Sequence, residues 1–262
     1  MKFNVVRNDI TNMQVDAIVL PANPKLKEGS GVSKQVFEKA GRKDLEQACK
    51  KYGKVETGEA IHTLGFSLSA KYIIHTVVPK WKENKDEYEL FQLLSESYFS
   101  ALKLADDIGC VSIAIPLLAS GHQGFTPKDS FEIAKQSIDA FLANNKLEKV
   151  ILVVYDKDAM SVMREQKIFV EELIDEEYVL TNDENYEPII KRALYRGKET
   201  TQRAVEKGVS VAKEQINNPE NHEKMIAAAV AAAKFVTDEK NRAKVKKVAE
   251  GVVKVATKLV KK

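Results

Sequence analysis

"VSIAIPLLASGHQGFTPKDSFEIA", residues 111–134, decides the fold class of this chain. Its first six residues form an apolar, β-branched run that is typical of a buried strand, and a helix is predicted to begin at Pro127. Two glycines, a serine and a histidine lie between them, which is more than a plain turn requires. The stretch therefore predicts a strand, a ligand-binding loop and a helix in succession, the repeating unit of α/β proteins.

The same alternation extends over residues 1 to about 178. Strand-like runs occupy residues 3–6, 15–20, 60–64, 71–78, 111–116 and 149–155, and helix-like runs occupy 33–52, 87–107, 127–144 and 158–177. Apolar strands between helices predict a mixed, mostly parallel central sheet in a three-layer α/β/α fold. Ligands of such sheets bind beyond the carboxyl ends of the strands, and two loops fit that role: "PANPKLKEGSGVS" (21–33) and "LASGHQGFTP" (118–127).

Composition divides the 262 residues into two units. Residues 187–262 carry 18 Lys/Arg against 9 Asp/Glu, whereas residues 1–186 carry 23 against 29, so the net charge of +3 conceals a basic tail. We expect an α/β domain at 1–180 and a helical, basic C-terminal region at 187–262. Two widely separated cysteines, no apparent signal peptide and no apolar run of about 18 residues predict a cytoplasmic protein without a membrane partner.

The glycines of both loops indicate an anion site. Backbone N–H groups at a glycine-rich turn before a helix bind phosphate, and two such loops at neighbouring strand ends would hold a diphosphate from both sides. The loop at Gly29 and Gly31 is neither a Walker A loop, which ends in Gly-Lys-Ser/Thr, nor a dinucleotide fingerprint, because Lys34 stands where the third glycine would be. In the second loop Phe125 is predicted to form an apolar wall.

Three stretches together resemble the macro domain, the ADP-ribose-binding module, in its bacterial form with a C-terminal helical extension. They are "RNDITNMQVDAIVLPANPKLKEGSGV" (7–32), "GEAIHTLGFSLSAKYIIHTVVPKW" (58–81) and "SIAIPLLASGHQGFTPKDSFEIA" (112–134), and the resemblance covers about residues 1–165. It implies binding of ADP-ribose or mono-ADP-ribosylated protein, with weak hydrolysis of ADP-ribosyl or O-acetyl-ADP-ribose esters as a further expectation. The implied contacts are Asp9, Ile10, Asn23, Gly29, Ser30, Gly31, Val32, Ser120, Gly121, His122, Gln123, Gly124, Phe125 and Tyr155.

The resemblance also distributes roles among these residues. Asp9 and Ile10 would hold the adenine edge near Tyr155, and the two glycine loops would hold the diphosphate. Asn23 would face the distal ribose, and Asn23 and His122 are the candidate catalytic residues. No metal or cofactor is expected.

The chain departs from hydrolytic members of the family, which leaves the enzymatic question open. Leu20 replaces the first Asn of "NAAN", Ser33 replaces the acidic residue after "GV", and Phe37 replaces a histidine. The departures at Ser33 and Phe37 favour a reader over an eraser of the modification. The alternative function is a catalytically inactive reader or scaffold whose basic tail engages RNA or a partner protein.

Simpler interpretations stand beside these. Asp9 and Asn23 are also ordinary turn residues, and the His122 side chain could point to solvent while only its amide binds. His62 and His75 lie on apolar strands and are expected in the core rather than in a metal site. Nucleic-acid binding by the tail is not favoured, because its lysines alternate with Ala, Val and Glu and few aromatic residues accompany them.

Overall fold

A computed structural model describes residues 2–82, 85–143 and 147–182. The expected helical region at 187–262 lies outside these residues. The elements in chain order are β1 (Phe3–Arg7), the 3-10 helix η1 (Ile10–Asn12), β2 (Ala17–Ala22), α1 (Val32–Ala40), α2 (Arg42–Cys49), the 3-10 helix η2 (Lys50–Tyr52), β3 (Ala60–Leu64), β4 (Tyr72–Val77), α3 (Glu87–Asp107), β5 (Ser112–Pro116), α4 (Pro127–Leu142), β6 (Lys149–Val154), α5 (Lys157–Glu165), β7 (Val170–Glu172) and α6 (Glu176–Asn182).

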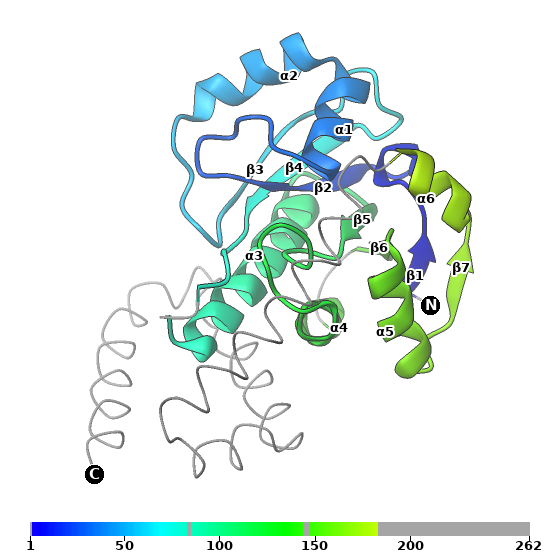
Figure 1. Cartoon of the computed structure of the whole chain (residues 1–262). Coiled ribbons are helices and arrows are strands. Elements are labelled where there is room, and N and C mark those ends of the chain that lie inside the picture. Colours follow the sequence, from blue (N-terminus) through cyan, green and yellow to red (C-terminus); the bar gives the residue numbers. More distant parts are fainter. Residues whose placement is uncertain (1, 83–84, 144–146, 183–262) are drawn as a thin grey trace, which may run out of the picture.

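One seven-stranded sheet runs through the described residues in the order β3-β4-β2-β5-β6-β1-β7 (Figure 1). Strand β3 is antiparallel to β4, and the other neighbouring strands pair in parallel. The predicted mixed, mostly parallel sheet is therefore confirmed. Because β2, β5, β6 and β1 are consecutive neighbours and parallel, their carboxyl ends meet at one edge, where the loops that follow them come together.

Helices cover both faces of the sheet, as a three-layer fold requires. Side chains of successive strand residues point to opposite faces, so Val19 lies in the core beneath α3, α4 and α5, and its neighbours Ile18 and Leu20 lie in the core beneath α1 and α2. Figure 1 shows α1 and α2 on one side of the sheet and α3, α4 and α5 on the other. Both cores consist of buried hydrophobic residues, each at most 8% exposed.

Two expected helices differ from the structure. The helix expected over 33–52 is interrupted at Gly41, whose φ of 101° ends α1 and separates it from α2. The prediction of one helix over 158–177 is wrong: α5 ends at Glu165, Lys167 adopts a left-handed φ of 54°, and the chain becomes strand β7 and then helix α6. Pairing of β7 with β1 satisfies the backbone at this sheet edge, and that long-range gain overrides the local helical pattern.

Both cysteines are free and buried. Burial raises the pKa of Cys49 and of Cys110 to about 11, so both thiols stay protonated at neutral pH. Within the described ranges, no three His, Cys, Asp or Glu side chains form a group able to hold a metal ion. In the same ranges, no helix combines the length and apolar character that crossing a bilayer demands.

His75 should make the fold sensitive to acid. The ring lies in the core on β4, 1% exposed, with Nε2 at 3.0 Å from the hydroxyl of Thr63, and burial lowers its pKa to about 3. Between pH 6.5 and 3 the His75 side chain is protonated in the unfolded chain and neutral in the folded chain. We therefore expect the free energy of unfolding to fall by about 1.4 kcal/mol per pH unit below pH 6.5 because of this group, and to be unaffected by it above pH 6.5.

Denaturant titrations of wild type and His75→Phe from pH 7.5 to 4.5 measure this contribution. The variant should lose the acid-dependent slope that His75 supplies, while His62→Phe, a change at a half-buried histidine on β3, should keep it. Parallel pH profiles of wild type and His75→Phe would contradict the prediction.

Candidate functional site

A cleft of about 340 Å³ lies at the carboxyl ends of β2, β5, β6 and β1. Its position follows from the topology, because these central strands all end at one edge of the sheet. The lining residues are Asn8, Ile10, Pro21, Ala22, Asn23, Gly29, Ser30, Gly31, Val32, Ser33, Gln35, Pro116, Leu117, Ala119, Ser120, Gly121, His122, Gln123, Val153, Tyr155, Asp156 and Ala159.

The loop between β2 and α1 forms one wall of the cleft. Asn23 fixes its start, since the Asn23 side chain accepts from the amides of Lys25 and Lys27 and donates to the Lys27 carbonyl at 2.6 Å. At its end the Gly29 amide donates to the hydroxyl of Ser33 at 3.0 Å. The local turn role of Asn23 is thus realised, and the same residue lines the cleft.

The loop between β5 and α4 forms the opposite wall. Ser120 donates through its hydroxyl to the Leu117 carbonyl at 2.9 Å. The amides of Gly124 and Phe125 donate to the carbonyls of Gly121 and Ala119, so they support the loop from within. Gly124 has a φ of 93°, which glycine adopts without strain and which allows this tight closure.

The two loops face each other across the cleft. A side chain added at Gly31 would begin 4.0 Å from Cε1 and Nδ1 of the His122 ring. Gly31 stands directly before α1 with a φ of 62° and a ψ of −132°, a conformation that only glycine adopts readily. His122 is half-buried and lines the cleft, so its ring lies between the two walls rather than out in solvent.

The other end of the cleft is built by residues that follow β1 and β6. Asn8 and Ile10 line it, and the Asn8 amide donates to the Val154 carbonyl at 3.1 Å, which joins the two strand ends. Tyr155 lines it from the β6 side, while its carbonyl accepts from the guanidinium of Arg7.

Asp9 lies just behind this end, 2% exposed, and caps η1. Burial opposes ionisation of the Asp9 carboxyl. Hydrogen bonds from Thr11 and the ion pair with Lys39 outweigh that cost and hold the pKa of Asp9 below its ordinary value. The carboxylate is therefore ionised at neutral pH.

The structure brings most of the predicted contacts together, with three exceptions. Asp9, Gly124 and Phe125 do not belong to the lining of the cleft. Phe125 is 2% exposed, and its ring packs edge-on against Trp81 with the centroids 5.2 Å apart. The aromatic ring thus supports the second loop from the core side, and the predicted apolar wall is supplied by Leu117 and Ala119 instead.

Sequence patterns missed several residues of the site. Asn8 and Asp156 line the cleft, and Lys39 and Tyr178 bond to Asp9. Asn8 and Asp156 are next in sequence to the predicted contacts Asp9 and Tyr155, and this adjacency could have identified them. The contact of Tyr178 with Asp9 spans 169 residues, and no local pattern indicates it.

Ser33 and Phe37 occupy different environments. Ser33 is buried at the rim of the cleft with its hydroxyl engaged by Gly29, so no carboxylate stands there. Phe37 is 1% exposed and packs in the core beneath α1 and α2.

Comparison with known proteins agrees with this arrangement. The model of the Macro domain family matches residues 19–134. A protein named O-acetyl-ADP-ribose deacetylase from Escherichia fergusonii is 37% identical over 162 residues, which are 60% of this chain and 90% of that protein. A macro domain-containing protein from Methanosarcina mazei is 39% identical, over 60% of this chain and 83% of its own length. The chain therefore belongs to the macro domain family.

Solved structures show the same likeness. A mutant macrodomain of Oceanobacillus iheyensis with ADPR superposes with a TM-score of 0.58 and 32% identity, covering 62% of this chain and 90% of that one. A Trypanosoma brucei macrodomain in complex with ADP-ribose gives a TM-score of 0.57 and 27% identity, covering 63% of this chain and 69% of that one.

Proposed function

We propose that this protein binds ADP-ribose, free or attached to protein, in the cleft at the carboxyl edge of the sheet. The observation that carries the proposal is the opposition of two glycine loops, with Gly31 and His122 facing each other across the space between them. Backbone amides at loops before two helices suit a diphosphate. The relatives with ADPR or ADP-ribose in their structures support the same ligand.

The ligand's orientation follows from the two ends of the cleft. Its adenine belongs beside Asn8, Ile10 and Tyr155, with Asp9 behind them as the ionised acceptor for the exocyclic amine. The diphosphate belongs between residues 29–32 and 120–123. The distal ribose then reaches Asn23 and His122, the proposed catalytic residues.

Titration calorimetry with ADP-ribose tests this function, with AMP and ribose 5-phosphate as half-ligands. The complete ligand should bind more tightly than either half, because only it spans both ends of the cleft. Absence of heat with ADP-ribose at millimolar concentration would exclude the proposed ligand.

A reader that hydrolyses ADP-ribosyl esters slowly, if at all, fits the cleft better than an efficient eraser. Ser33 stands where hydrolytic members carry an acidic residue, and its hydroxyl already accepts from the Gly29 amide. Phe37 replaces their histidine and is buried in the core. The relatives named deacetylases support testing hydrolysis directly. The alternative, an inactive scaffold whose tail engages RNA or a partner, concerns residues 187–262 outside the described part.

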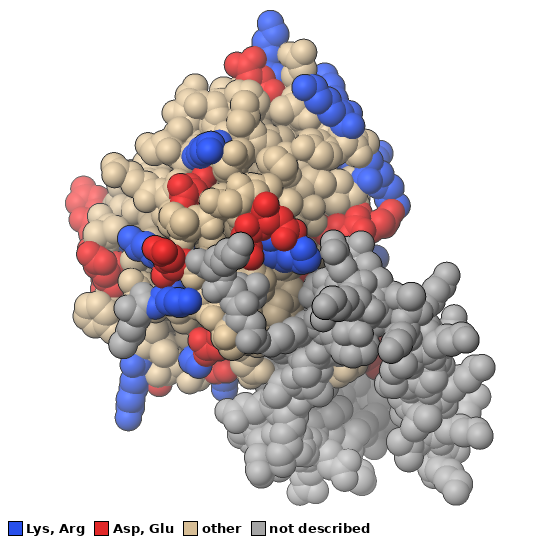
Figure 2. Space-filling view, turned by 180° about the vertical axis from the view of Figure 1, so that it is seen from behind, with Lys and Arg blue, Asp and Glu red and all other residues tan. Residues whose placement is uncertain are grey.

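On the face of the described residues that Figure 2 shows, acidic and basic side chains are interspersed rather than gathered by sign.

Asn23→Ala should lower any turnover of O-acetyl-ADP-ribose or mono-ADP-ribosylated protein by about 100-fold, since misplacing the reacting ribose by about 1 Å costs that much. Single-turnover product formation measures this effect, and calorimetry on the same variant measures affinity. Turnover lost with affinity retained indicates a role in the reaction. Equal loss of both would mean that Asn23 only braces the loop through Lys25 and Lys27.

A further inference from the structure

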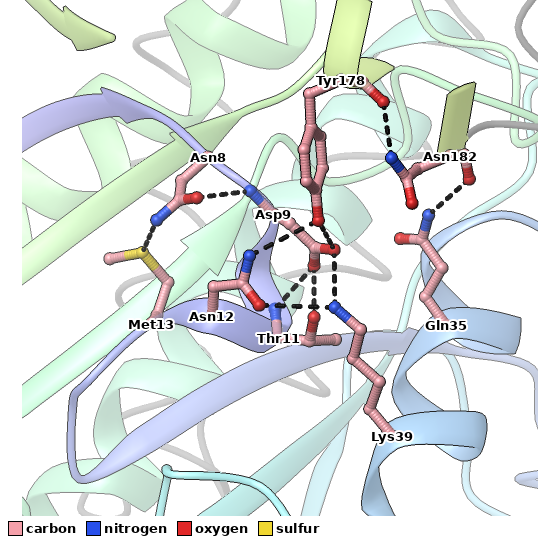
Figure 3. A network of polar contacts seen from close by, with 9 residues as sticks. All are labelled: Asn8, Asp9, Thr11, Asn12, Met13, Gln35, Lys39, Tyr178 and Asn182. Carbon is pink, nitrogen blue, oxygen red and sulfur yellow. Dashed lines mark hydrogen bonds and ion pairs between the residues drawn. The ribbon is translucent and has the colours of Figure 1, made fainter. Parts of the chain in front are cut away.

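Helix α6 is attached to the adenine end of the cleft by polar contacts. Glu176 at its start pairs with Arg7 at 2.6 Å, and the carbonyl of Asn182 at its end accepts from Gln35 of α1 at 3.1 Å. Between them the Tyr178 hydroxyl donates to Oδ2 of Asp9 at 3.1 Å (Figure 3). Helix α6, which follows strand β7, thus brings the chain back to Asp9, the carboxylate proposed to bind the adenine amine.

The Asp9 carboxylate has no acceptor site left for a ligand in this arrangement. Two carboxylate oxygens offer about four lone-pair positions. Oδ1 accepts from the amide and the hydroxyl of Thr11, and Oδ2 accepts from Lys39 Nζ and from the Tyr178 hydroxyl, both at 3.1 Å. An exocyclic amine that is to bind Asp9 must therefore replace one of these donors.

Tyr178 is the donor whose departure costs least. The Thr11 donors belong to the turn that Asp9 itself caps, so they cannot leave without unwinding η1. Lys39 forms an ion pair with a buried carboxylate, and its loss would leave that charge uncompensated. Replacing the Tyr178 hydroxyl with the exocyclic amine exchanges an O–H donor for an N–H donor, and neither group brings a charge.

We propose that Tyr178 is a specificity-determining residue of the base subsite, whose hydroxyl must give way to the 6-amino group of adenine. This inference rests on the proposed binding of ADP-ribose. Binding of an adenine ligand then breaks the Tyr178 contact of α6, while the Arg7–Glu176 pair retains the start of the helix. A base with a carbonyl at position 6 presents an acceptor there, which cannot replace the Tyr178 hydroxyl as a donor to Oδ2, and it leaves Tyr178 in place.

Tyr178→Phe tests the inference with two ligands, ADP-ribose and its hypoxanthine analogue, inosine diphosphate ribose. Removing the hydroxyl leaves Oδ2 with one acceptor site vacant, so ADP-ribose should bind about tenfold more tightly, the ratio that 1.4 kcal/mol represents. Affinity for inosine diphosphate ribose should not rise. Tyr52→Phe is the matched control, since Tyr52 also donates its hydroxyl, but to the His62 carbonyl at 2.6 Å and not to Asp9.

Amide hydrogen exchange of residues 176–182 in the full wild-type chain gives a second test that needs no variant. Exchange in α6 should become faster when ADP-ribose binds and should not change with inosine diphosphate ribose. Slower exchange with ADP-ribose, or Tyr178→Phe binding ADP-ribose no better than wild type, would overturn the inference while leaving the proposed function intact. If neither wild type nor variant binds ADP-ribose, both proposals fail.

Discussion

Gly31→Ala should weaken ADP-ribose binding by about 5- to 150-fold. The residue precedes α1 at a φ of 62° and a ψ of −132°, and forcing a side chain into such a conformation costs about 1–3 kcal/mol. The loop can relieve that strain only by rotating the amides of residues 29–32 away from the diphosphate. Calorimetric titration with ADP-ribose measures the loss.

Gly109→Ala is the matched control for Gly31→Ala. Gly109 also has a positive φ, 79°, but a side chain there meets no atom within 4 Å, and the residue does not line the cleft. This variant should lose some thermal stability and keep its affinity for ADP-ribose. If both glycine variants bind like wild type, the amides of the first loop do not hold the phosphates.

Asp9→Asn should damage stability and binding together. The carboxylate is buried and accepts four hydrogen bonds, and a carboxamide cannot accept all of them because its NH2 group would face donors. We expect the free energy of unfolding to fall by about 2 kcal/mol, the scale of a hydrogen bond to a charged group. Affinity for ADP-ribose should fall about tenfold, because the acceptor for the adenine amine is lost as well.

Asp16→Asn separates these two effects. Asp16 accepts from the amides of Val111 and Ser112 and from the Ser112 hydroxyl, but it precedes β2, at the opposite edge of the sheet from the cleft. Its loss should lower stability without changing affinity, both measured as for Asp9→Asn. An Asp9→Asn protein that binds ADP-ribose as wild type does would show that the carboxylate does not read the base.

The sequence predicts those parts of the fold that depend on local patterns. Apolar, β-branched runs such as residues 149–155 identify the central strands, and the glycine loops after two of them identify the cleft. The break near Lys167 and strand β7 were not predictable, because β7 forms by pairing with β1, more than 160 residues earlier. A short strand at a sheet edge gives too weak a pattern to compete with the helical spacing around it.

The site shows the same division. Gly31 and His122 belong to recognisable loops and lie where the loops predict. Phe125 belongs to the same loop, yet its ring turns toward Trp81 and Phe91, since an aromatic ring gains more by burial than at the rim of a cleft. Tyr178 could not be predicted, because its contact with Asp9 exists only once the sheet is complete.

The position of β1 has a consequence for synthesis of the protein. β1 lies between β6 and β7, so among the described residues it pairs only with the two strands farthest from it in sequence. Its backbone groups have no sheet partner until β6, which ends at Val154, has been synthesised. The adenine end of the cleft, which begins directly after β1, therefore forms only once β6 is available, and a nascent chain cannot complete the cleft before β1 has paired with β6.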